Sequence, residues 1–270
     1  MKIPRLLSAL IAFATAFIAF TSLSARAQTL GERARGRGGE GEAHLVLTYS
    51  CPVQNRPAFR AHMEGKGVAQ FEQWKKEGVV KNYLILFSHF VNAQLEDMWV
   101  ILNFEKFADI GKWQAIERKF PGGLSADGLA LGTPKTCVYT DKGWSGGKLN
   151  ADQTKSAYMM IPYTTLVSAD EYADFVTRYV EPQLKGWVKH GIMHTYAVHI
   201  EQNPTNAPWD SLMVFEYDGL RGIALRDVVK QAVRDNELKN DAGYKHFSPI
   251  KRGIRKELQP ATFDAIVPKK

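Results

Sequence analysis

The feature of this 270-residue sequence that most constrains its fold is an internal repeat. Trp74 and Trp187 each begin the pattern Trp-x-x-x-Gly, and each lies 23 positions before an aspartate, Asp97 or Asp210. An apolar run follows both aspartates in the same register. The spacing predicts two small units of about 100 residues each with the same arrangement of helices and strands.

The hydrophobic period changes in the same order in both copies. Each copy begins with a strand-like run that contains Tyr49 or Tyr163, and continues with a helical pattern that ends at Gly78 or Gly191. Ser168 opens this helix in the second copy as part of a capping box. Two strands, a second helix and a last strand follow. The expected strands are 45–50, 80–89, 98–104 and 136–140, then 158–167, 192–200, 212–217 and either 252–258 or 262–267.

Two β-α-β-β-α-β units in one chain resemble the dimeric α+β barrel superfamily. The resemblance is one of topology and spacing, and covers residues 43 to 267. It implies an α+β fold in which two tandem ferredoxin-like units face their antiparallel sheets together as a barrel within one chain. The superfamily includes chlorite dismutases, dye-decolorising peroxidases, haem-degrading and antibiotic-biosynthesis mono-oxygenases, muconolactone isomerases and stress-response binding proteins. Fold alone therefore leaves the function open.

The N-terminus has the features of a cleavable export signal. A positive start precedes an apolar run at 6–20, and small residues end in Ala27, after which we expect cleavage. An uncleaved anchor is the alternative, but a membrane helix needs about 20 apolar residues. We therefore expect a periplasmic or secreted protein that is free of the membrane after cleavage. The expected segments are a signal peptide at 1–27, a flexible tether at 28–42, units at 43–143 and 156–270, and a linker at 144–155.

Charge gives little support for a nucleic-acid partner. Loss of residues 1–27 removes three basic and no acidic residues, so the net charge falls from +7 to +4. Basic and acidic residues are interspersed except in the run 251–256, and recognition of phosphates needs cations clustered on one face. We expect no nucleic-acid partner, and we interpret the basic run as a solvated face.

Three histidines lie close together in the second copy. In a regular strand His190 and His194 would project to one side and His199 to the other, so the three could not hold one metal ion. Exposed or hydrogen-bonded histidines are the simplest interpretation, and we expect no metal and no cofactor. The resemblance implies haem as the alternative, with His194 or His199 as iron ligand, although strand 212–217 lacks the distal arginine of a chlorite dismutase.

One face of each strand should line a cavity between the two sheets. The more continuously apolar face of strands 98–104 and 212–217 is expected to pack on helices, which turns the other face inward. Repeat symmetry adds residues of the second strand of each copy. The resulting ligand-binding candidates are Lys81, Tyr83, Trp99, Asn103, His194, Tyr196 and Glu216.

Such a cavity suits a small apolar or aromatic molecule that needs few hydrogen bonds. His194 or Glu216 could act as a general base if burial moved its pKa toward neutrality. We therefore predict an exported small-ligand-binding protein whose enzymatic activity is undecided. The alternatives are a cofactor-independent mono-oxygenase or isomerase, a haem enzyme, and a non-catalytic scaffold with a filled barrel. A homo-oligomer is left open.

The two cysteines give a separate prediction. The first and fourth strands of a split β-α-β unit are antiparallel neighbours, so Cys51 and Cys137 should lie at the same end of adjacent strands. An exported chain meets an oxidising compartment. We predict a Cys51–Cys137 disulfide, with two buried free thiols as the alternative.

Overall fold

The computed structural model describes residues 41–202 and 207–268. The expected signal peptide and residues 28–40 of the expected tether lie outside these residues. Within the described ranges, no helix has the length and apolar character needed to cross a membrane.

The first half has the element order strand, helix, strand, strand, helix, strand. The first helical segment is divided into two by a π-helical turn at Met63–Gly67. A short additional helix precedes the last strand. The elements are β1 (Ala43–Ser50), α2 (Arg56–His62), α3 (Val68–Lys76), β2 (Asn82–Ser88), β3 (Met98–Phe104), α4 (Ile110–Glu117), α5 (Ala126–Leu129) and β4 (Thr133–Gly147).

The second half repeats this order and adds two short helices near its end. Its first helical segment again contains a π-helical turn, at Val176–Val180. The elements are β5 (Ala157–Thr165), α6 (Ala169–Phe175), α7 (Glu181–Lys189), β6 (Met193–Glu201), β7 (Ser211–Tyr217), α8 (Gly219–Ala232), α9 (Ala242–Phe247), α10 (Lys251–Ile254), β8 (Arg255–Glu257) and β9 (Ala261–Ile266).

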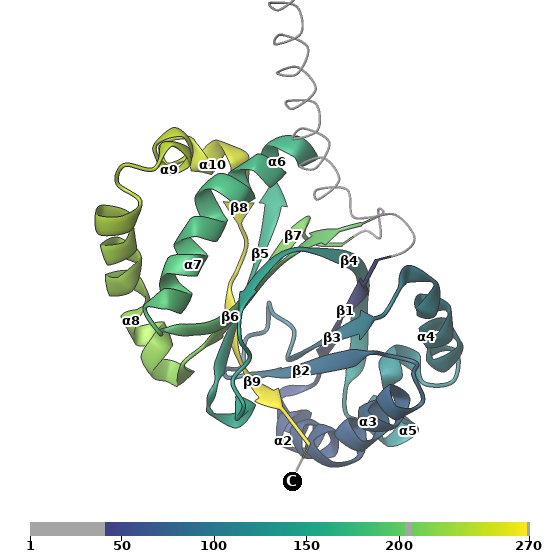
Figure 1. The fold of residues 1–270 in the computed structure, drawn as a ribbon. Coiled ribbons are helices and arrows are strands. Elements are labelled where there is room, and N and C mark those ends of the chain that lie inside the picture. The colour runs from purple at the N-terminus through teal and green to yellow at the C-terminus, as the bar shows by residue number, and fades with distance from the viewer. Residues whose placement is uncertain (1–40, 203–206, 269–270) are drawn as a thin grey trace, which may run out of the picture.

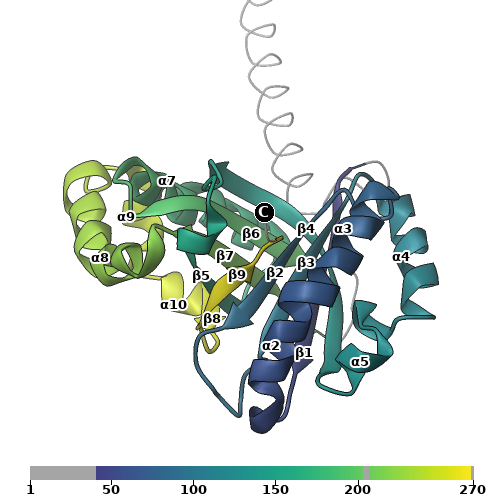
Figure 2. The same ribbon diagram turned by 90° about the horizontal axis from the view of Figure 1, so that it is seen from below.

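Eight strands close into one antiparallel barrel. The order is β4-β1-β3-β2 in the first half and β6-β7-β5-β9 in the second, and β4 pairs with β6 while β2 pairs with β9. Figure 1 shows the helices of the two halves outside the barrel on opposite sides, and Figure 2 shows the same arrangement from below. Closure leaves the barrel without a free edge. The chain therefore has an α+β fold built on a closed barrel.

The residues that mark the repeat make equivalent contacts in both halves. The Asp97 amide donates to the Tyr49 carbonyl at 2.8 Å, and the Asp210 amide donates to the Tyr163 carbonyl at 2.9 Å. Each aspartate carboxylate also accepts a hydrogen bond from a backbone amide near the end of the first strand of its half. The Cys51 amide donates to Asp97 at 2.8 Å, and the Thr165 amide donates to Asp210 at 2.7 Å. The equal spacing in the sequence thus reflects one repeated way of fixing the end of the first strand.

The helix boundaries follow the expected local signals. Gly78 and Gly191 have φ angles of 68° and 71°, the left-handed conformation that favours glycine after a helix. Ser168 and Glu171 form the expected capping box. Pro182 lies in the first turn of α7, directly after the π-helical turn, where its missing amide hydrogen is tolerated.

Three apolar cores result from this arrangement. One core lies between helices and sheet in each half, and the third fills part of the barrel interior. The expected facing of β3 and β7 is confirmed: Trp99 and Leu212 belong to the barrel core, whereas Val100 and Phe215 pack against helices.

Strand β4 is longer than the expected strand 136–140. Its second part pairs with β6 from Thr140, opposite Glu201, to Gly147, opposite Thr195. Gly147 has a φ angle of 86°, and a Cβ atom there would lie 1.9 Å from the His194 carbonyl oxygen, so this close pairing requires glycine. The start of the expected linker therefore forms part of the contact between the halves.

The predicted disulfide is wrong. Both Cys51 and Cys137 are free. Strands β1 and β4 are antiparallel neighbours as expected, but Cys137 lies opposite Leu47, four residues before Cys51. Four residues of strand span about 13 Å, well beyond the about 4.4–6.8 Å between Cα atoms that a disulfide allows. The error lies in the register, because β4 begins at Thr133, before the expected start of the strand.

Candidate functional site

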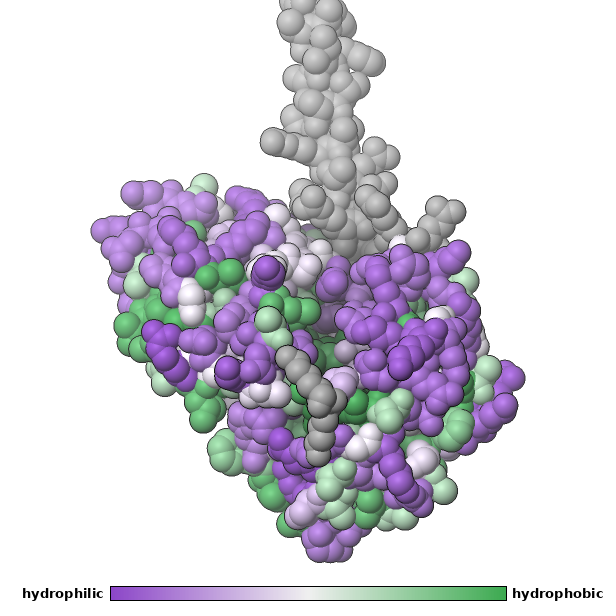
Figure 3. Space-filling view, turned by 60° about the horizontal axis from the view of Figure 1, so that its bottom comes forward, coloured by the Kyte–Doolittle hydropathy of each residue, from purple (hydrophilic) through white to green (hydrophobic). Residues whose placement is uncertain are grey.

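A cavity of about 1680 Å³, largely open to solvent, extends from the barrel interior to Arg60 and Lys75 of the first helical segment. Strands of both halves line it, together with residues 148–154 of the connection between the halves. On the face shown in Figure 3, apolar residues lie between the hydrophilic surfaces of the two halves. Ligand pockets commonly measure about 300–1,000 Å³, so the interior has room for a small molecule. An apolar core fills another part of the barrel, so the filled-scaffold alternative stays a prediction.

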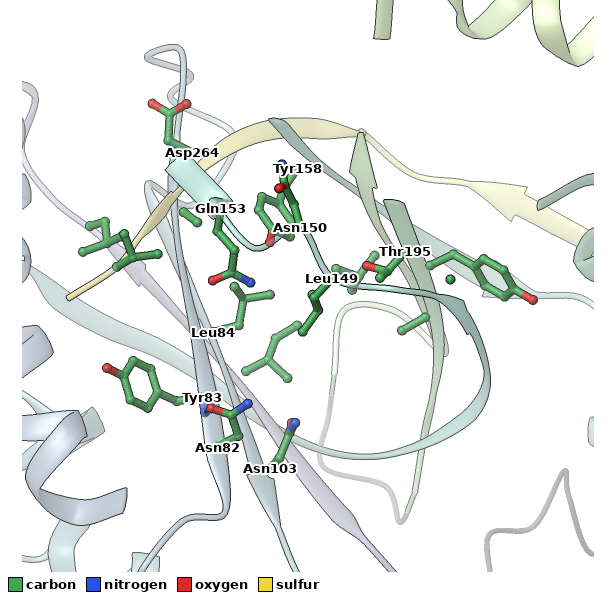
Figure 4. Close-up of a pocket in the computed structure, with 18 of the residues that line it drawn as sticks. Asn82, Tyr83, Leu84, Asn103, Leu149, Asn150, Gln153, Tyr158, Thr195 and Asp264 are labelled. Atoms are coloured by element: carbon green, nitrogen blue, oxygen red, sulfur yellow. Dashed lines mark hydrogen bonds between the residues drawn. The ribbon is translucent and has the colours of Figure 1, made fainter. Parts of the chain in front are cut away.

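The connection between the halves forms one wall of the cavity. Figure 4 shows Leu149, Asn150 and Gln153 extending over residues of β2 and β3. The backbone amide of Asn150 donates to Glu216 at 3.3 Å, and its side-chain amide donates to Ser156 at 3.3 Å. The composition of this segment predicts only a linker and gives no sign that the segment covers a cavity.

Glu216 is completely buried where the connection meets the barrel. Its carboxylate accepts hydrogen bonds from the hydroxyls of Ser156 at 2.8 Å and Thr195 at 3.1 Å, in addition to the Asn150 amide. Neutral donors therefore surround the carboxylate and hold it in place. These three bonds hold the connection against the barrel, and the role of Glu216 as a general base stays a prediction.

A pair of buried histidines lies at the cavity wall. His44 of β1 and His199 of β6 are only 1% and 2% exposed, and their ring centroids lie 5.2 Å apart in an edge-on arrangement. Nδ1 of His199 lies 3.1 Å from the Thr140 hydroxyl. Neither ring nitrogen of His44 has a hydrogen-bond partner among the described residues. Sequence analysis missed His44, since a single histidine in an apolar strand carries no signal of its own.

Both histidines are neutral at neutral pH. Burial, followed by the charge of Lys142, lowers the pKa of His44 to about 4. Burial, His44 and Lys142 together hold the pKa of His199 well below its ordinary value. A neutral imidazole has one nitrogen that donates and one that accepts a hydrogen bond. The His44 ring can therefore offer a ligand either kind of contact.

The expected orientation of β6 is wrong. Tyr196 packs in the helix-side core of the second half, whereas Ala197 lies in the barrel core. The register shifts between Met193 and Thr195 in the pairing of β6 with β7, so this strand cannot be oriented by simple alternation from its start. The inward positions on β6 are those of Ala197 and His199 instead of those of His194 and Tyr196.

The other predicted residues are placed as follows. Tyr83 and Tyr196 border the cavity, but their hydroxyls donate to Glu72 at 2.8 Å and Glu181 at 3.3 Å on the helix side. Lys81 lies before β2 and forms exposed ion pairs.

Two predicted residues of β3 lie inside the barrel. Trp99 belongs to the barrel core, and Asn103 lines the cavity and pairs with His44 in the register of β1 and β3. Of the predicted ligand residues, Asn103 is thus the one beside the buried histidine.

The remaining histidines do not gather at one site. His190 ends α7 at the surface, where it lies 2.7 Å from Glu237. His194 is partly exposed and lies 3.4 Å from the Asn150 amide and 3.7 Å from Asp218. In the described ranges, no group of three or more residues could hold a metal ion.

The two predicted haem ligands have different surroundings, and haem binding stays a prediction. An axial histidine must present a nitrogen to open space. His199 is 2% exposed, and its ring is packed against His44 and bonded to Thr140. His194 is not among the residues that line the cavity.

No family profile and no curated protein sequence matches this chain. Solved structures do match its fold. A candidate monooxygenase from Lactobacillus acidophilus has a TM-score of 0.54 at 11% identity, over 84% of this chain and 95% of its own. An anthrone oxidase-like protein has a TM-score of 0.51 at 10% identity, over 84% and 91%. A chlorite dismutase variant from Candidatus Nitrospira defluvii has a TM-score of 0.50 at 9% identity, over 84% and 92%.

At these identities the likeness concerns the fold alone. The chain has the dimeric α+β barrel fold, with the barrel closed within one chain.

Proposed function

We propose that this protein binds a small, largely apolar or aromatic molecule with a hydroxyl or carbonyl oxygen in the barrel cavity. The observation that carries the proposal is His44, whose two ring nitrogens lack partners although the side chain is buried at the cavity wall. A buried polar group without a partner costs about 1–3 kcal/mol. Both nitrogens are covered by neighbouring atoms in this structure, so a ligand oxygen would bond one of them by displacing the side chains that separate it from the cavity.

The lining agrees with this kind of ligand. Apolar side chains form one part of the cavity wall, and polar and charged side chains line the rest. A flat apolar body could contact the former while one or two oxygens meet the latter. The apolar positions include Leu84, Ile101, Leu149, Ala197 and Val214, and the polar ones include His44, Asn103 and Thr195.

We also propose that each half is a ferredoxin-like unit and that the protein works in the periplasm or outside the cell. The recurrence of one strand order supports the first point, with the fourth strand beside the first and the second strand beside the third. The composition of residues 1–27 supports the second.

A cofactor-independent mono-oxygenase is the second candidate function. The candidate monooxygenase and anthrone oxidase-like proteins share the fold, and His44 is a neutral base at neutral pH. Such a reaction would convert an activated methylene carbon into a carbonyl, with one oxygen atom of O₂ entering the product and the other leaving as water with both hydrogens. A base with a pKa of about 4 is weak near pH 7, so we place binding first.

The binding test uses 2-naphthol and naphthalene, which differ by one hydroxyl group. We expect both to bind the purified protein in a titration that follows their fluorescence. His44→Leu should weaken 2-naphthol about tenfold, because one hydrogen bond is worth about 1–1.5 kcal/mol, and should leave naphthalene unchanged. His190→Leu, which alters an exposed histidine, is the matched control.

Equal weakening of both probes by His44→Leu would contradict the hydrogen bond, and failure of both probes to bind would contradict the cavity as a ligand site. Oxygen uptake with an aromatic substrate that carries an activated methylene group, lost in His44→Leu, would favour the mono-oxygenase over the binder.

A further inference from the structure

A second cavity lies outside the barrel, in the second half of the chain. It measures about 360 Å³ and lies between the helix-facing side of β5 and β7 and helices α6 to α8, with α10 and β8 at its edge. Its apolar wall belongs to the helix-side core of this half. The apolar lining includes Phe175, Tyr179, Leu184, Trp187, Met213 and Phe215.

Basic side chains surround this apolar wall. Six line the cavity with a single acidic residue, Glu257, beside them. The basic residues are Arg226, Lys230, Arg234, Lys251, Arg252 and Arg255. Three of them belong to the basic run 251–256, whose composition predicts a solvated face.

Two of these arginines have no carboxylate partner among the described residues. Nη1 of Arg226 contacts the Met159 sulfur at 3.1 Å, and its Nε is buried without a hydrogen-bond partner. Nη1 of Arg255 contacts the Met213 sulfur at 3.5 Å. Both arginines are half-buried, and a thioether is only a weak hydrogen-bond acceptor. An anion would therefore be a stronger partner for these two guanidinium groups than the sulfur atoms they contact.

Aromatic rings hold one of the two guanidinium groups in position. The Arg255 guanidinium carbon lies 3.8 Å from the Tyr163 ring centroid and 5.1 Å from that of Phe175. Stacking orients the planar group and leaves its N–H edges free to bond an anion. The Arg234 Nε donates to the neutral Gln183 side chain at 2.9 Å, so that arginine also meets no carboxylate there.

We propose that this cavity binds a small organic anion with an aromatic or otherwise apolar body. The apolar wall would contact the body, and Arg226 and Arg255 would bind its acidic group. A guanidinium matches the geometry of a carboxylate, sulfonate or phosphate with paired N–H bonds. No histidine is among the residues that line this cavity, so the site differs from that of a haem held by an imidazole.

The test uses two probes that share one aromatic body. 1-Anilinonaphthalene-8-sulfonate carries a sulfonate, and N-phenyl-1-naphthylamine lacks it; both fluoresce when they enter an apolar site. In the purified protein, Arg226→Gln and Arg255→Gln should each weaken the sulfonate probe at least tenfold and change the neutral probe less than twofold. Added salt should weaken only the sulfonate probe.

Two controls place the effect at this cavity. Arg221→Gln alters an exposed arginine of the same helix, α8, that pairs with Asp218, and should leave both probes unchanged. His44→Leu alters the barrel cavity and should leave the sulfonate probe unchanged, so failure of the barrel proposal and failure of this one are distinguishable.

The conservative variants Arg226→Lys and Arg255→Lys keep the charge and lose the paired N–H geometry. They should bind the sulfonate probe with intermediate affinity while circular dichroism stays that of the parent protein. Sulfonate binding that is insensitive to all four substitutions, or equal losses for both probes, would overturn the proposal.

Discussion

The two halves of this molecule share one order of elements and differ in how they fill the space between helices and sheet. In the first half Trp113 of α4 closes that space, with its ring centroid 5.4 Å from that of Trp74 and 6.3 Å from that of Phe71. Trp113 lies 16 positions after Asp97, and Arg226 lies 16 positions after Asp210. Arg226 of the second half thus stands at the sequence position that corresponds to Trp113 of the first half. Trp113 is packed in a core, whereas Arg226 lines the second cavity.

The halves also differ in how a partly buried arginine is neutralised. Arg56 in the first half forms an ion pair with Asp97, and it donates to the Ser88 carbonyl at 2.8 Å. In the second half the equivalent aspartate, Asp210, bonds the backbone and hydroxyl of Thr165. Arg56 of the first half therefore has a carboxylate partner, whereas Arg226 and Arg255 of the second half have none among the described residues. This contrast supports the proposed anion site in the second half.

The largest effect we expect comes from the two equivalent aspartates. Asp97→Ala should lower the free energy of unfolding by about 3–5 kcal/mol, because it leaves the guanidinium of Arg56, 11% exposed, without its carboxylate. Asp210→Ala removes hydrogen bonds to neutral groups and should cost about 1–2 kcal/mol. Urea denaturation of both variants measures the difference. Equal losses would mean that the halves do not differ in their use of this aspartate.

Much of the fold could be predicted because the repeat is visible in the sequence. The spacing of Trp74 and Trp187 to their aspartates reflects contacts that recur in both halves. The facing of β3 and β7 was also predictable, since an apolar face must pack against helices. These features depend on periodicity within single elements, which one sequence contains.

The parts that failed depend on relations between elements. The register of β4 against β1 separates Cys137 from Cys51, and no local pattern specifies register. A register shift near Thr195 decides which side of β6 faces the cavity. The basic run 251–256 has the composition of a surface segment, and the cavity beside it is created by helices that are distant in sequence.

We expect an intermediate effect on stability from the protonation of His44 and His199, the two buried histidines of the barrel. The exposed His190 serves as the comparison. Burial lowers the pKa of His44 to about 4 and that of His199 in the same direction, so the unfolded chain binds more protons than the folded one below about pH 6.5. Their contribution to stability is complete above that pH and is lost as the pH falls toward 4. The slope for each histidine is at most about 1.4 kcal/mol per pH unit.

The measurement is the free energy of unfolding between pH 7 and pH 4 for the parent protein and for a His44→Leu/His199→Leu variant. We expect the parent to lose more stability than the variant over this range. His190→Leu, which alters a histidine paired with Glu237 at the surface, is the control and should follow the parent curve. Parallel curves for parent and double variant would show that the barrel histidines are not held neutral.

The smallest effect we expect tests the comparison of the halves directly, by giving the second half the tryptophan of the first. Arg226→Trp should raise the free energy of unfolding by about 1 kcal/mol, because it removes a guanidinium without a carboxylate and buries apolar surface in a cavity of about 360 Å³. It should also abolish binding of 1-anilinonaphthalene-8-sulfonate. Arg221→Trp, on the exposed side of α8, is the control and should do neither. A clear loss of stability in Arg226→Trp would mean that the arginine stabilises the fold, and that the two halves differ in their packing and not in their need for an anion.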